Sequence, residues 1–89
     1  MNVTRAQYIG DYTLEVWFDN GESRTVDFSA VILFSSNALV AQFADKTKFQ
    51  QFAIDEGVLT WNNDMDFAPE ALYYATNGLQ HKDNSNDEN

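Results

Sequence analysis

The chain has 89 residues, of which 14 are acidic and 5 are basic, so its formal net charge is −9. A surface this acidic is unsuited to binding nucleic-acid phosphates directly or anionic lipid. The absence of cysteine excludes disulfide bonds and thiolate zinc sites. The apolar runs are a few residues long, far short of the roughly 20 that span a bilayer. We therefore expect a cytoplasmic protein with neither a nucleic-acid nor a membrane partner.

The domain is expected to end before the C-terminus of the chain. Residues 80–89 contain no apolar side chain and therefore have nothing to bury. With 44% hydrophobic and 15% aromatic residues, the rest of the chain can form one small core. We predict a single domain over residues 1–78 and a disordered acidic tail over residues 79–89.

A β-hairpin is predicted near the N-terminus, after a first strand over residues 3–9. Residues 12–18 and 22–28 both alternate with period two. A three-residue loop with Gly21 in the left-handed conformation pairs Leu14 with Val26 and leaves one apolar and one mostly polar face.

Glu15 and Trp17 fall on the polar face of this predicted hairpin. A large aromatic side chain there indicates either a second packed layer, such as the C-terminal helix, or an interaction surface. The pattern alone leaves both interpretations open.

A second hairpin is predicted over residues 52–55 and 58–61. A two-residue loop pairs Ile54 with Leu59 and keeps the large side chains on one face. Between the hairpins, residues 38–43 suit either a short helix or an extended stretch. Asp45 is typical of the cap of a helical turn that directs Phe49 inward.

The last predicted element is a helix over residues 69–76. Pro69 suits the first helical position, and Glu70 complements the helix dipole. Asn77 and Gly78 form a typical stop signal. Leu72 and Tyr73 are spaced so that they can face the sheet.

The segment from Trp61 to Tyr73, with its Asp-x-x-Pro-Glu-x-Leu-Tyr pattern, resembles the bacterial domain of unknown function 2442 family. The first hairpin, around residues 14–22, and the middle of the chain, residues 49–55, are also similar to that family. The resemblance implies a small α+β fold, with a curled antiparallel sheet of β-hairpins and a short C-terminal helix packed on it. It implies no catalytic residues. Many members are encoded beside another small protein, in an arrangement similar to toxin–antitoxin pairs.

Catalytic and metal-binding patterns are weak in this sequence. His81 is the only histidine and falls in the predicted tail, where it has neither a pocket nor a positioned partner. Asn62, Asn63, Asp64 and Asp66 offer clustered oxygen ligands for a divalent cation, but the spacing lacks the glycine and glutamate of an EF-hand. A turn followed by a helix cap at Asp66 explains the same residues. We expect no enzyme, cofactor or metal.

The leading hypothesis is a non-enzymatic protein-interaction module, an antitoxin-like or regulatory partner of a small basic protein. Its expected contact residues are Glu15, Trp17, Asp64 and Asp66. The alternative is a small-molecule or divalent-cation binding domain that uses the Asn62–Asp66 turn. A homodimer through an open sheet edge is a third hypothesis.

Overall fold

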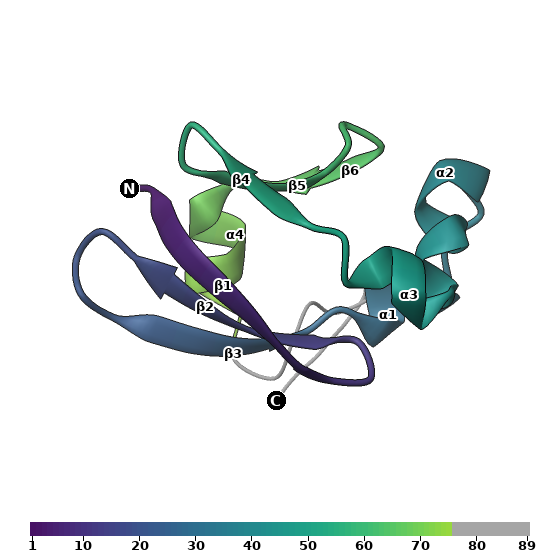
Figure 1. The fold of residues 1–89 in the computed structure, drawn as a ribbon, viewed down its shortest axis with the longest axis horizontal. Helices are drawn as coiled ribbons and strands as arrows, with labels where there is room; N and C mark the ends of the chain where they lie inside the picture. The colour runs from purple at the N-terminus through teal and green to yellow at the C-terminus, as the bar shows by residue number, and fades with distance from the viewer. Residues whose placement is uncertain (76–89) are drawn as a thin grey trace, which may run out of the picture.

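The computed structural model describes residues 1–75, which form two three-stranded antiparallel sheets and a set of short helices (Figure 1). Sheet A contains β1 (Val3–Gly10), β2 (Thr13–Phe18) and β3 (Ser23–Asp27), and sheet B contains β4 (Ala53–Asp55), β5 (Val58–Trp61) and β6 (Met65–Phe67). The helices are α1 (Ser29–Leu33), α2 (Ala38–Ala41), the 3₁₀ turn η1 (Gln42–Ala44), α3 (Lys46–Phe49) and α4 (Pro69–Tyr73). The predicted α+β class is confirmed. The strands are divided between two sheets.

The β2–β3 hairpin has the predicted register. Leu14 lies opposite Val26 and Val16 lies opposite Arg24. Gly21 has a φ of 88°, and its N–H donates to the Phe18 carbonyl at 3.0 Å. The three-residue loop follows from this conformation, because a positive φ is inexpensive for glycine.

The β4–β5 hairpin also has the predicted register, with Ile54 opposite Leu59. Its two-residue turn places Glu56 at φ 51° and Gly57 at φ 83°. Both values are typical of the type I′ turn that suits the twist of a hairpin.

Strand β6 was not predicted from the sequence. Asn62 and Asn63 both have positive φ, at 52° and 63°, and they turn the chain back so that Met65 pairs with Trp61. The predicted capping of the last helix by Asp66 is wrong. Asp66 lies on β6, and the N-cap of α4 is Ala68, which makes no side-chain capping bond.

The segment between the two hairpins is helical. Residues 38–44 form α2 and η1, which settles the choice that the sequence left open. Asp45 caps α3 as predicted, since its carboxylate accepts the Thr47 N–H at 2.9 Å. The capped turn buries Phe49 completely. Helix α1 was not predicted and contributes the buried Ile32.

The two sheets share one core between their inner faces, with α4 between them and α1–α3 at one end (Figure 1). Strand β1 connects the sheets, because the Val3 N–H donates to the Gly57 carbonyl at 2.8 Å. The largest fully buried side chains come from both sheets and from the helices: Trp61, Phe28, Phe49, Leu14, Ile32, Leu59, Leu72, Val16 and Val26. The outer faces of the sheets therefore point away from each other.

Helix α4 begins at Pro69, as predicted, and packs on the inner face of sheet A. Leu72 is fully buried, and the ring of Tyr73 meets Phe18 edge-on at 5.2 Å. The helix ends at Tyr73, with Tyr74 as its C-cap, so the predicted end at Thr76 is wrong. The predicted stop signal, the domain boundary at 78 and the tail lie outside the described residues. Within residues 1–75, no helix is long and apolar enough to cross a bilayer.

Candidate functional site

Trp17 lies on the outer face of sheet A, and α4 does not cover it, because α4 packs on the inner face. Arg5 lies directly across from Trp17 on β1. The guanidinium carbon of Arg5 is 4.3 Å from the centre of the indole ring, a cation–π contact. The ring is thus half-buried by a neighbour on its own sheet.

Glu15, next to Trp17 on the same face, is already hydrogen-bonded. The Thr25 hydroxyl donates to its carboxylate at 2.5 Å from the adjacent strand. Hydrogen bonds from Thr25 and Ser23 lower the pKa of Glu15 below its ordinary value of 4.5. The Glu15 carboxylate on the outer face of sheet A therefore already has hydrogen-bond partners within the sheet.

Asp64 and Asp66 are separated by the structure. Asp64 accepts a hydrogen bond from the Gln42 amide at 3.1 Å and lines a small hollow of about 170 Å³ that also includes Lys48 and Trp61. Asp66 belongs to the exposed outer face of sheet B. The turn after Trp61 therefore does not present both carboxylates to one ligand.

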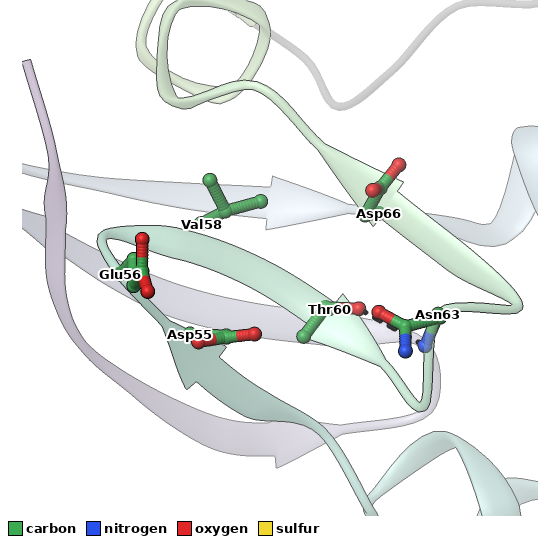
Figure 2. Close-up of a pocket in the computed structure, with 6 residues that line it drawn as sticks. All are labelled: Asp55, Glu56, Val58, Thr60, Asn63 and Asp66. Carbon is green, nitrogen blue, oxygen red and sulfur yellow. Dashed lines mark hydrogen bonds between the residues drawn. The ribbon is translucent and has the colours of Figure 1, made fainter.

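Asp66 instead joins two other carboxylates around an open hollow of about 360 Å³ on the outer face of sheet B. We call this surface the acidic hollow. Figure 2 shows Val58 and Thr60 on the central strand, with Asp55 and Glu56 to one side and Asp66 to the other. Asn63 completes the lining.

The strand register explains why these residues share a face. Asp55 lies opposite Val58, and Thr60 lies opposite Asp66. Side chains alternate along a strand, so these four point outward. The side chains on the opposite face of β5, such as Leu59, point into the core. The Thr60 hydroxyl accepts the Asn63 N–H at 3.3 Å, which ties the turn to the floor of the hollow.

No cation neutralises the acidic hollow within the described part of the chain. Residues 52–75 include five acidic side chains and no basic one. The ion pairs in residues 1–75 are Arg24 with Glu22 and Lys46 with Asp11, and neither involves sheet B. Asp55, Glu56 and Asp66 therefore present three uncompensated negative charges to solvent.

The three carboxylates surround the hollow without converging on a point. Among residues 1–75, no group of three or more histidine, cysteine, aspartate or glutamate side chains is placed to hold a metal ion. Separated carboxylates around an open hollow are instead suited to several lysine or arginine side chains of another protein.

Sequence reasoning found Asp66 but did not assign Asp55 and Glu56 to a contact surface. Their grouping depends on β6, which was not predicted. The available signal was the absence of any basic residue over 52–75.

Comparison with known proteins identifies the family of the chain. None of the curated proteins and none of the solved structures gives a significant match. A family model described as protein of unknown function (DUF2442) matches residues 3–78, most of the chain and all three strands of each sheet. The chain therefore belongs to the DUF2442 family.

Proposed function

We propose that this chain is a non-enzymatic interaction module that binds a small basic protein through the acidic hollow. The observation that carries the proposal is the set of three carboxylates, Asp55, Glu56 and Asp66, on one sheet face with no counter-charge in the described residues. Such a face attracts a cationic partner over a distance of about a Debye length and raises the association rate.

The partner is proposed to be regulated or neutralised by this contact, as in an antitoxin-like pair in the bacterial cytoplasm. The gene arrangement implied by the family resemblance supports an antitoxin-like role. The net charge of −9 adds a general attraction for basic proteins, and the hollow adds a local shape for specific cationic side chains.

Asp66 remains in the proposed contact set, now with Asp55 and Glu56. Glu15, Trp17 and Asp64 have intramolecular partners that a binding protein would need to displace. Displacement costs part of the binding free energy, so we propose these three only as peripheral contacts.

The test is affinity capture by the full-length chain from native lysate, followed by release with a salt gradient. We expect one stoichiometric basic protein, released between about 0.05 and about 0.5 M salt as screening increases. The triple variant Asp55→Asn, Glu56→Gln, Asp66→Asn should bind that protein about tenfold or more weakly, because it loses three charged contacts.

The matched control removes the same amount of charge from strand β3 and the two turns of sheet A, outside the acidic hollow. Asp11→Asn, Asp19→Asn, Asp27→Asn should keep the affinity within about threefold, since only long-range attraction is lost. Equal losses in both variants would show that net charge alone drives binding and would refute the acidic hollow as the site. If calcium or magnesium raises the melting temperature of the wild type but not of the hollow variant, the cation-binding alternative replaces the proposal.

A further inference from the structure

Within the described residues, strand β3 has one edge that pairs with no other strand. Sheet A has the order β1-β2-β3, so β3 is paired on one side only. The Phe18 N–H donates to the Glu22 carbonyl at 2.9 Å, and the Phe28 N–H donates to the Tyr12 carbonyl at 2.8 Å. In an antiparallel pair, hydrogen-bonded and non-hydrogen-bonded residues alternate along each strand. Thr25 lies midway between these pairs, and its N–H and C=O therefore point away from β2.

This edge is protected only near one end, where the Arg24 guanidinium donates to the Ser23 carbonyl at 2.8 Å, so a second strand would have to share that carbonyl with Arg24. Residues 23–27 contain no proline or lysine, and the β2–β3 register has no bulge. The other edge of sheet A is different, because β1 has two register irregularities and the Val3 N–H is used by the Gly57 carbonyl. Of the two edges, β3 is the one that residues 1–75 leave open to another strand around Thr25.

Among the described residues, the surroundings of Thr25 leave room for that strand. Thr25 is exposed, and an open hollow of about 500 Å³ lies beside it, lined by Arg24, Thr25, Tyr73, Tyr74 and Ala75. Tyr74 is 73% exposed at the rim of this hollow. The edge and the hollow together form a surface with backbone hydrogen-bonding groups and an aromatic wall.

We propose that a second copy of this chain adds its own β3 to this edge, antiparallel and centred on Thr25, to form a two-fold dimer with a continuous six-stranded sheet. The occupant is inferred from the self-complementary register. Thr25 lies opposite Thr25 of the second copy, a favourable cross-strand pair, and Ser23 lies opposite Asp27, which it can hydrogen-bond. Arg24 lies opposite Val26, so no like charges meet directly.

The net charge of −9 opposes this association, and a five-residue strand pair buries less than the roughly 800 Å² per partner of a standard interface. The dimer is therefore weak and becomes stronger as salt screens the repulsion between copies. This salt dependence is opposite to that of the proposed basic partner. The two proposals use different faces, so either can fail without the other.

The test is sedimentation equilibrium of the full-length chain at high concentration, at low and at moderate salt. We expect a monomer–dimer equilibrium that shifts toward dimer with salt. Thr25→Pro removes the central N–H donor from both copies and should raise the dissociation constant by about tenfold or more. Proline is tolerated here in the monomer, because this N–H faces solvent.

The matched control is Thr25→Val, which keeps the N–H and the branched side chain and should leave the dissociation constant within about twofold. Hydrogen exchange of the wild type gives a second readout that needs no variant. The Thr25 amide should become protected as the concentration rises, while amides in the β2–β3 ladder should change little. A wild type that stays monomeric, or a dimer that Thr25→Pro leaves intact, would overturn the proposal.

Discussion

The two sheets of this protein share one core, but they differ in whether the charged side chains on their outer faces have intramolecular partners. On sheet A, Arg5 covers Trp17 and Thr25 hydrogen-bonds Glu15. On sheet B, the three carboxylates around the acidic hollow have no such partner in the described residues. The difference shows that composition alone does not make a face a binding surface. What matters is whether the strand register places a partner opposite each charge.

The largest expected effect concerns the two tryptophans, one from each sheet. Trp61 is fully buried and its indole N–H donates to the Phe49 carbonyl at 2.6 Å, whereas Trp17 lies on an outer face. Trp61→Phe should lower the free energy of unfolding by about 2–4 kcal/mol, because it leaves a cavity and a buried carbonyl without a donor. Trp17→Phe should cost less than about 1 kcal/mol, mainly through a weaker contact with Arg5. Urea denaturation followed by circular dichroism measures both, and equal losses would contradict the assigned faces.

The glycines of the two hairpin turns give the next comparison. Both have positive φ, so replacement by alanine strains either turn by about 1 kcal/mol. At Gly21 an added Cβ meets open space, but at Gly57 it would lie 2.6 Å from Cγ and 2.7 Å from Cβ of Asn2. Gly57→Ala should therefore cost about 2 kcal/mol or more, since this turn also receives the Val3 N–H.

Thermal and urea unfolding of the two alanine variants checks this order. Adding Asn2→Gly to Gly57→Ala should recover part of the loss, because it removes the side chain that clashes. If Gly21→Ala is the more damaging variant, sheet B is not held against β1 as described.

The smallest expected effect is the pH dependence of the sheet A contacts. Hydrogen bonds from Thr25 and Ser23 lower the pKa of Glu15 in the folded protein below its ordinary value of 4.5. The unfolded chain therefore takes up this proton more readily. The stability that the contact adds is fully present above about pH 4.5 and is lost as the pH falls through the folded-state pKa.

Glu15→Gln should make the acid side of the stability–pH curve slightly flatter, and an NMR titration of Glu15 should give a midpoint below 4.5. The effect is small because Glu15 is close to solvent. A titration midpoint at or above 4.5 would show that this carboxylate is not held by its neighbours, and the contrast between the sheets would then be weaker.

The hairpins could be predicted because their signals are local. Gly21 after Asp19-Asn20, and Gly57 after Glu56, stand where the alternating runs end, and turn geometry then fixes the register. The cap at Asp45 and the proline at the start of α4 are local signals of the same kind. The prediction that Trp17 lies on the polar face followed from the hairpin register.

Strand β6 and the role of Asp66 could not be predicted in the same way. Three residues with an aspartate at their centre carry almost no strand signal, and a carboxylate shortly before a proline is typical of a helix cap. Asp66 lies on a strand because β5 offers it a partner and because Met65 and Phe67 contribute to the core. The consecutive asparagines at 62 and 63, both tolerant of positive φ, were the local hint of this reversal.

The sequence by itself determined the acidity of the protein, its α+β class, its two hairpins with their registers, and the inward position of Phe49. Each of these depends on residues that are close together in the chain. Only the tertiary structure decided that the strands form two sheets around one core, that Arg5 covers Trp17, and that Asp55, Glu56 and Asp66 surround one hollow. These features depend on which strands pair and which faces are buried, and the shared core, packed from both sheets and the helices, determines both.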